Sequence, residues 1–207
     1  MIDFQSYFDH ITTDEYAVGA KAHGLPTVIT SLNAHVYLGP RRICIQGAVS
    51  HKVWPRRSVL PGCTWAMLHV RFHVAEPAQE FLDDMTIWLA EYEISIWFNI
   101  LVDDAAMMLW GGAGNLRKVI VRACQNLFAW VKDTLRKQVS TKKNQCIVSS
   151  RNLKDRIAKQ MLPLKMPVMM YGEMLGVDCT AGGRISRRAI QHKRAATAFS
   201  RRSRISW

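Results

Sequence analysis

Two adjacent aspartates, Asp103 and Asp104, lie between two apolar segments and constrain the fold of this chain more than any other feature. The two segments, 94–101 and 105–110, both have the composition of β-strands. Two carboxylates inside a core would be costly unless they were paired or bound to a metal. At the tip of a β-hairpin, both can face one cleft and bind divalent cations. We therefore expect a hairpin over 94–110 with Asp103 and Asp104 at its tip.

An isolated pair of aspartates is more often a solvated turn or a helix cap, so partner residues elsewhere decide its meaning. Asp83 and Asp84 illustrate the solvated alternative, because they lie on the polar face of an acidic helix predicted over 78–92. Phosphoryl transfer with two metal ions requires at least one further carboxylate on a neighbouring strand. Asp3, at the end of a short apolar segment, is the best candidate for that carboxylate.

The composition is that of an ordinary globular protein. The chain has 207 residues, of which 49% are hydrophobic and 21% charged, enough for one sizeable domain or for one domain with a small appendage. Its five cysteines never form a C-x-x-C pair, which argues against a zinc site or disulfide framework and favours a reducing compartment. No stretch approaches the roughly 18 apolar residues of a membrane span, and the first residues lack a signal-peptide pattern. We expect a soluble intracellular protein, nuclear or cytoplasmic, with no membrane partner.

The positive charge is concentrated near the C-terminus. Of the net charge of +12, residues 184–207 contribute eight basic side chains and no acidic one, and the rest of the chain contributes +4. The eight are Arg184, Arg187, Arg188, Lys193, Arg194, Arg201, Arg202 and Arg204. They predict a polyanionic partner, most simply nucleic acid bound nonspecifically through its phosphates with steep salt dependence. A solvated tail or a targeting patch is equally compatible with this composition.

Hydrophobic periodicity predicts an α+β fold with antiparallel strand pairing. The expected helices cover residues 9–23, 27–38, 64–74, 78–92, 116–135 and 152–161. The expected strands, besides the hairpin over 94–110, lie at 42–49, at 145–148 and in a hairpin around 168–178. Helices and short hairpins without regular β-α-β alternation are typical of an antiparallel sheet with helices packed against it.

Histidines and aromatic residues in the periodic segments have a structural interpretation. His69 and His73 have the i, i+4 spacing of metal ligands, but no third ligand accompanies them, so we expect a partly buried pair. Aromatic side chains in the most periodic segments are expected in the core rather than as platforms that stack on bases. They are Trp97, Phe98, Trp110, Phe128 and Trp130.

With Asp3 placed beside the aspartate pair, the chain resembles the palm domain of reverse transcriptases, the RNA-directed DNA polymerases of retroelements. In that family a D-x-x-x-x-F-D segment supplies the first metal-binding carboxylate, and residues 3–9 have this pattern. The resemblance implies that Asp3 binds metal and that Phe8 excludes a nucleotide 2′-hydroxyl. The family's aspartate-pair hairpin matches Val102-Asp103-Asp104.

Three further segments follow in the family's order. Residues 57–64 resemble a turn and following helix that support the template and the incoming nucleotide, with Gly62 in the turn. Residues 135–143 resemble a segment in which a lysine approaches the nucleotide phosphates, and Lys143 is the preferred match. Leu175 and Gly176 resemble the hairpin that grips the primer strand. The ordered set covers about residues 2–178, which is most of the chain.

The resemblance implies a polymerase palm-like antiparallel sheet with packed helices and the start of a thumb over 1–178, followed by a basic tail over 179–207. The family's fingers region is expected to be lacking, as in a partial, N-terminally truncated or degenerate copy. The implied activity is synthesis of DNA from deoxynucleoside triphosphates on an RNA template and a DNA primer.

The resemblance also assigns the metal site. Asp3 and Asp103 would ligate two Mg²⁺ ions, with Asp104 assisting. A non-catalytic nucleic-acid-binding protein that keeps the palm fold and the basic tail is the alternative. The sequence leaves the oligomeric state open.

Overall fold

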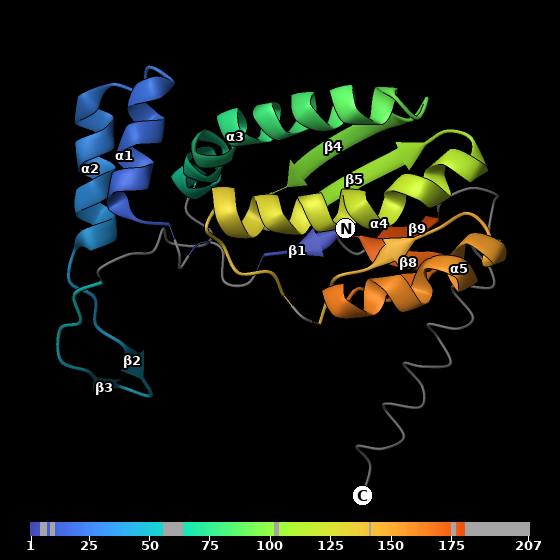
Figure 1. Ribbon diagram of the computed structural model, residues 1–207. Coiled ribbons are helices and arrows are strands. Elements are labelled where there is room, and N and C mark those ends of the chain that lie inside the picture. The colour runs from blue at the N-terminus through green and yellow to red at the C-terminus, as the bar shows by residue number, and fades with distance from the viewer. Residues whose placement is uncertain are drawn as a thin grey trace, which may run out of the picture. The chain divides into compact units, whose positions relative to one another are not determined.

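The computed structural model describes residues 1–4, 8, 11–55, 64–101, 104–140, 142–174 and 177–180 (Figure 1). These residues form an α+β structure with helices and small, mostly antiparallel sheets, as the periodicity predicts. The chain divides into two compact units, Ile2–Lys143 and Met1 with Asn144–Trp207.

The larger unit contains a three-stranded antiparallel sheet with the strand order β1-β5-β4. Its long hairpin consists of β4 (Ser95–Leu101) and β5 (Asp104–Trp110), and the pairing ends at Leu101 opposite Asp104. The third strand is β1 (Ile2–Asp3), which pairs with the start of β5. The hairpin predicted over 94–110 is thereby confirmed.

Helices cover one face of this sheet. Since alternate residues along a strand point to opposite faces, only every second side chain of β4 and β5 can contact these helices. Phe98 of β4 contacts Phe81 and Trp130, with ring centroids 5.2 and 5.5 Å away. Phe81 and Trp130 also contact each other, at 5.1 Å, so three elements meet in one aromatic cluster. Ala105, which shares the face of Phe98, is completely buried.

One continuous helix, α3 (Thr64–Ala90), replaces the two helices expected at 64–74 and 78–92. Proline lacks an N–H group and normally kinks or ends a helix, yet Pro77 lies inside α3. The apolar stripe continues across it, because Val70, Val74, Phe81 and Met85 are all buried. The indole Nε1 of Trp130 donates a hydrogen bond of 3.0 Å to the Pro77 carbonyl, so Trp130 contacts α3 at the proline.

The helix predicted over 116–135 is present as α4 (Ala113–Ala129), which continues into the π-helical turn η2 (Trp130–Thr134). Its buried side chains recur at three- and four-residue intervals, as expected of an amphipathic helix. Figure 1 shows α3 and α4 beside the β4–β5 hairpin.

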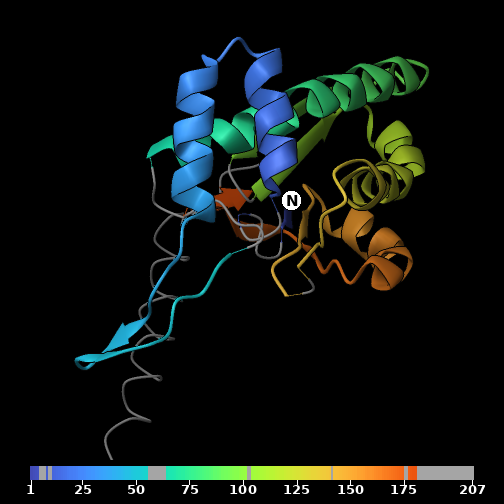
Figure 2. The same cartoon turned by 90° about the vertical axis from the view of Figure 1, so that its left-hand side faces the viewer.

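Two further helices, α1 (Thr13–Ala22) and α2 (Thr27–Leu38), form a helical hairpin (Figure 2). The prediction for α2 matches its bounds, and α1 lies inside the predicted 9–23. A Cβ atom at Gly19 would lie 3.2 Å from the backbone of Phe72, so the glycine allows α1 to approach α3 closely. Short strands β2 (Cys44–Ile45) and β3 (Ala48–Val49) form a separate antiparallel hairpin, where one short strand followed by a turn was expected over 42–49.

His69 lies at the junction of α1, α2 and α3 and is completely buried. The rings of Tyr16 and Tyr37 contact it, with centroids 3.9 and 5.6 Å away. Within the described residues, neither of its ring nitrogens has a hydrogen-bond partner. Burial therefore disfavours the charged imidazolium and lowers the pKa of His69 to about 4.

This burial predicts an acid-sensitive fold. Since the pKa of His69 is lower in the folded state than in the unfolded state, the unfolded state binds more protons, and stability falls as the pH drops from 6.5 to 4. We expect protonation of His69 to lower the free energy of unfolding by about 2–3 kcal/mol over that pH range. Urea unfolding at pH 7 and pH 4 measures the loss, and His69→Phe should reduce it. The exposed His35→Gln is the control, and an equal loss in His69→Phe would contradict the assignment.

In the smaller unit, main-chain hydrogen bonds connect two residues that are far apart in the sequence. The Met1 ammonium donates to the Gln145 carbonyl at 2.9 Å, and the Gln145 N–H donates to the Met1 carbonyl at 3.1 Å. Strands β6 (Cys146–Ile147) and β7 (Val168–Met169) are parallel, which corrects the expectation of purely antiparallel pairing.

The remaining elements of this unit follow the sequence prediction closely. Helix α5 (Arg151–Met161) is capped by the Ser150 hydroxyl, which accepts a hydrogen bond from the Leu153 N–H. A short 3₁₀ helix, η3 (Leu162–Leu164), follows it. Strands β8 (Tyr171–Met174) and β9 (Val177–Thr180) form the expected antiparallel hairpin. Among the described residues, no helix has the length and apolar character that crossing a membrane requires.

Candidate functional site

Asp3 and Asp104 lie directly opposite each other on the neighbouring strands β1 and β5. In an antiparallel pair, side chains at opposed positions project from the same face, with Cβ atoms about 4.5–5.5 Å apart. The adjacent pair, Ile2 and Ala105, projects from the other face and is completely buried. Two carboxylates are therefore held side by side over a buried apolar layer, although 100 residues separate them in the sequence.

The far edge of β1 is also paired, which fixes the position of Asp3 from both sides. The Ser140 N–H donates a hydrogen bond of 2.8 Å to the Asp3 carbonyl, and Phe4 forms an antiparallel bridge with Val139. Phe4 is almost completely buried, and Asp3 is only 6% exposed. The Asp3 carboxylate thus lies on a rigid backbone rather than in a frayed terminus.

Lys143 completes this cluster. Its Nζ atom lies 2.9 Å from Oδ1 of Asp3, so the two side chains form an ion pair. The Asp3 side chain is 8% exposed, whereas that of Lys143 is 69% exposed. The lysine therefore reaches a nearly buried carboxylate from solvent. Its long, flexible side chain can turn toward an anionic ligand without disturbing a packed core.

The chemistry of these side chains suits a hard divalent cation. Like charges at opposed strand positions destabilise a sheet, and a cation between them removes that cost. Carboxylate oxygens are the ligands that Mg²⁺ prefers in proteins. Within the described residues, no cluster of three or more His, Cys, Asp or Glu side chains could hold a metal. Asp103, the third carboxylate expected here, lies outside the described residues.

Several residues predicted to contact nucleic acid lie outside the described part of the chain. They are Gly62, Leu175, Gly176 and the basic residues Arg184, Arg187, Arg188, Lys193, Arg194, Arg201, Arg202 and Arg204. Phe8 is described and is partly exposed. The roles that the resemblance assigns to these residues stay predictions.

The sheet face that carries Asp3 and Asp104 also exposes large apolar side chains. Trp97 is 39% exposed, its strand partner Met108 is 53% exposed, and Trp110 is 51% exposed. The expectation that Trp97 and Trp110 belong to the core is therefore wrong. The strand alternation explains the error, because these residues project away from the face that α3 and α4 cover. The aromatic character of both strands concealed which face is buried.

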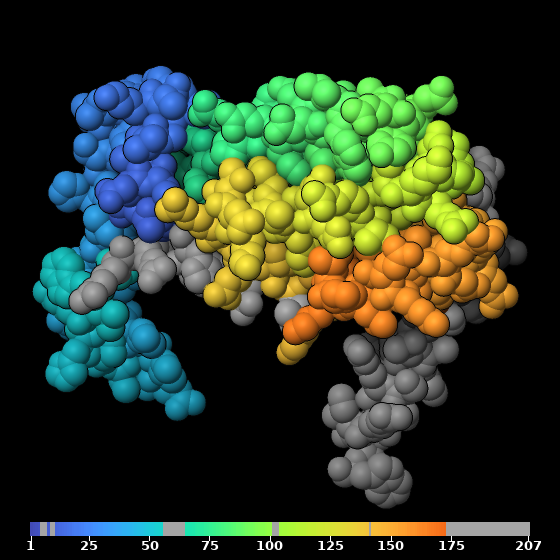
Figure 3. All heavy atoms as spheres, in the orientation of Figure 1, coloured from blue at the N-terminus to red at the C-terminus, as the bar shows by residue number. Residues whose placement is uncertain are grey.

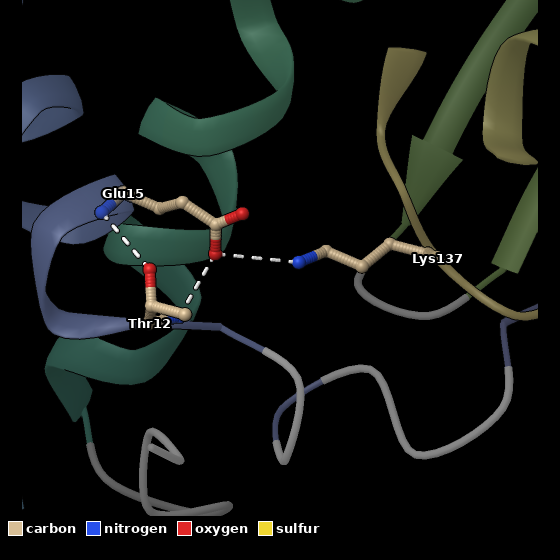
Figure 4. Close-up of polar contacts among 3 residues, drawn as sticks. All are labelled: Thr12, Glu15 and Lys137. Atoms are coloured by element: carbon tan, nitrogen blue, oxygen red, sulfur yellow. Dashed lines mark hydrogen bonds and ion pairs between the residues drawn. The ribbon is translucent and has the colours of Figure 1, made fainter. Parts of the chain in front are cut away.

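A second charged cluster, centred on Lys137, was missed by the sequence prediction (Figure 4). The Lys137 side chain is only 2% exposed, and its Nζ atom lies 3.4 Å from Oε2 of Glu15. Glu15 belongs to a capping box at the start of α1, in which Thr12 and Glu15 exchange hydrogen bonds of 2.8 and 3.2 Å. The Thr-x-x-Glu spacing was visible in the sequence, but it contains no information about a lysine 122 residues away.

The electrostatics of the Lys137 cluster are consistent with a charged pair. Burial raises the pKa of Glu15, but the Thr12 N–H, the Lys137 ammonium and His73 together outweigh it and leave that pKa below 4.5. Burial and Lys137 lower the pKa of His73, and Glu15 opposes this shift only in part. Glu15 therefore stays ionised and His73 neutral near pH 7.

Comparison with protein-family models and with curated proteins finds no match to this chain. Its function is therefore inferred from its own residues, and the opposed carboxylates of Asp3 and Asp104 are the feature with the most specific chemistry.

Proposed function

We propose that this chain is a reverse transcriptase-like palm domain that supports RNA-templated DNA synthesis by two-metal nucleotidyl transfer. One observation carries the proposal: Asp3 and Asp104, remote in sequence, face each other on adjacent antiparallel strands. Lys143, assigned to the same site from its motif, forms an ion pair with Asp3. Three residues selected from separate motifs thus lie in one cluster, and this proximity supports the proposal.

Each residue of the cluster would have a separate role in nucleotidyl transfer. Asp3 and Asp104, together with Asp103, would hold Mg²⁺. Bound there, the metal supplies activation of the primer 3′-hydroxyl and neutralisation of the leaving pyrophosphate. Pairing of β1 on both edges keeps the Asp3 carboxylate in place, and the buried side chains of Ile2 and Ala105 support the site from below. The exposed Lys143 ammonium would move from Asp3 to the triphosphate of the incoming nucleotide.

Non-catalytic binding of nucleic acid is the second candidate, and the exposed face of the sheet favours it. Trp97 and Trp110 present large aromatic surfaces on the face that carries the carboxylates. Bases stack on such side chains with about 1–3 kcal/mol each, whatever their sequence. A protein with this face would bind a single strand even without completing a catalytic cycle.

Primer extension distinguishes these functions. We expect the full chain to extend a labelled DNA primer annealed to an RNA template when Mg²⁺ and the four deoxynucleoside triphosphates are present. Removal of the metal with EDTA should stop the reaction, because the two carboxylates alone cannot neutralise the leaving pyrophosphate. Gel electrophoresis measures the extension, and fluorescence anisotropy measures binding of the primer–template. Binding without extension would select the non-catalytic function, and absence of both at low salt would overturn both proposals.

A further inference from the structure

A groove of about 440 Å³ lies between α3 and the α4–η2 helix in the larger unit. Phe81, Met85 and Trp130 form its floor and are 7%, 3% and 6% exposed. Trp88 lines the groove farther along α3 and is partly exposed. Figure 3 shows the surfaces of α3 (green) and α4 (yellow) side by side over this stretch. The groove thus combines buried apolar side chains with a partly exposed tryptophan.

Two carboxylates stand on the α3 wall of the groove. Glu80 and Asp84 are exposed, lie one helical turn apart and both line the cavity. In the described part of the chain, neither forms an ion pair. The groove-lining residues contributed by α4 and η2 are uncharged or aromatic, with Asn126, Ala129 and Thr134 beside Trp130. No cation of the lining therefore neutralises the two carboxylates.

The negative charge extends along the whole helix. Between His73 and Arg117 the sequence has eight acidic residues and no lysine or arginine, although the chain as a whole carries a net charge of +12. Six of the eight lie on or just after α3, at Glu76, Glu80, Asp83, Asp84, Glu91 and Glu93, and all six are exposed. A nucleic-acid phosphate would be repelled by this surface, whereas a cationic segment would be attracted to it.

We propose that this groove binds an arginine-rich segment of a partner protein. A guanidinium group stacks on aromatic faces such as Trp88 and at the same time forms paired hydrogen bonds with a carboxylate. Glu80 and Asp84, at i and i+4, match two cationic side chains one helical turn apart on the partner. The surface lies on the α3–α4 side of the sheet, opposite the face that carries Asp3 and Asp104, so it adds a protein partner to the nucleotidyl-transfer function.

Fluorescence anisotropy with a labelled nona-arginine peptide tests this proposal on the full chain. We expect binding that weakens between about 50 and 200 mM salt, since exposed charges are increasingly screened. Glu80→Gln/Asp84→Asn should weaken it at least about tenfold, because both carboxylates of the groove lose their charge. Asp83→Asn/Glu91→Gln removes the same charge from positions on and just after α3 that do not line the groove, and it should weaken binding less than about threefold.

The aromatic floor is tested separately by Trp88→Ala, which leaves the charge unchanged. We expect a loss of about 3- to 30-fold in affinity, as a cation–π contact at a partly desolvated site would give. Equal weakening by the two charge-removing variants would show a diffuse acidic surface and overturn the groove. No measurable binding of the peptide would also overturn it. Self-association of the full chain that Glu80→Gln/Asp84→Asn abolishes would replace the partner protein by a second copy of this chain.

Discussion

Asp104→Asn is expected to reduce Mg²⁺-dependent primer extension at least about 100-fold, since even residues that only orient a metal ligand cost about 10- to 100-fold when mutated. The neutral amide keeps the shape of the side chain but loses the charge that draws a cation to the site. Asp3 and Asp104 are directly opposed on their strands, so the same substitution also removes one of two like charges at paired positions. The free energy of unfolding measured without metal should therefore stay unchanged or rise by about 0.2–1 kcal/mol.

Opposite effects on activity and stability distinguish a metal site from a structural pair. Primer extension and urea unfolding in EDTA are measured on the same preparations of wild type and variant. Asp83→Asn is the matched control, because Asp83 is an exposed aspartate on α3, away from the sheet. Full activity in Asp104→Asn would overturn the site. A loss of stability larger than about 1 kcal/mol without metal would show instead that the Asp104 carboxylate supports the fold.

The local elements of this fold are largely predictable from the sequence. The hairpin over 94–110 follows from two apolar strand-like segments that flank a polar turn. The α2 helix ends where Gly39 and Pro40 forbid its continuation, and its bounds match the prediction. These features depend on neighbouring residues alone.

Features that depend on distant residues were predicted less well. Two helices were expected at 64–74 and 78–92, whereas one continuous helix, α3 (Thr64–Ala90), replaces both, with Pro77 inside it. Trp97 and Trp110 were assigned to the core since apolar side chains occupy both faces of their strands, and only the packing of α3 reveals which face is covered.

In the candidate site, too, the features that depend on distant residues could not be predicted from local sequence. Pairing Asp3 with the hairpin required a known order of motifs, because nothing local relates residue 3 to residue 104. The structure brings Asp3, Asp104 and Lys143 together. No motif pointed to the buried pair of Lys137 and Glu15, because Lys137 lies in a polar stretch typical of an exposed turn. Burial of a charge is a tertiary property that composition does not contain.

Lys137→Met is expected to cost about 2–4 kcal/mol of unfolding free energy, the largest stability effect we anticipate for a single substitution. The methionine fills the space of the lysine stem, but the Glu15 carboxylate is left without its cation in a partly buried site. Removing one member of a buried ion pair costs about 3–5 kcal/mol, and we lower this range because the Glu15 side chain is 31% exposed. Urea unfolding at pH 7 measures the loss, with the exposed Lys132→Met as the control.

The double variant Lys137→Met/Glu15→Gln separates the charge effect from packing. If an unpaired carboxylate causes the loss, neutralising it should restore at least half of the lost stability, and the double-mutant cycle should show a coupling of about 1–3 kcal/mol.

The pH dependence of stability provides a further check on the Lys137–Glu15 pair. The pKa of Glu15 is lowered in the folded state, so its stabilisation is present above pH 4.5 and is lost as the pH falls through the lowered pKa. Lys137→Met removes the lysine's share of that shift and should flatten the dependence in this window. An unchanged profile with additive single effects would mean that Lys137 acts only through its apolar stem, whereas the expected coupling would identify the pair as the electrostatic link between the α1 cap and the segment that follows η2.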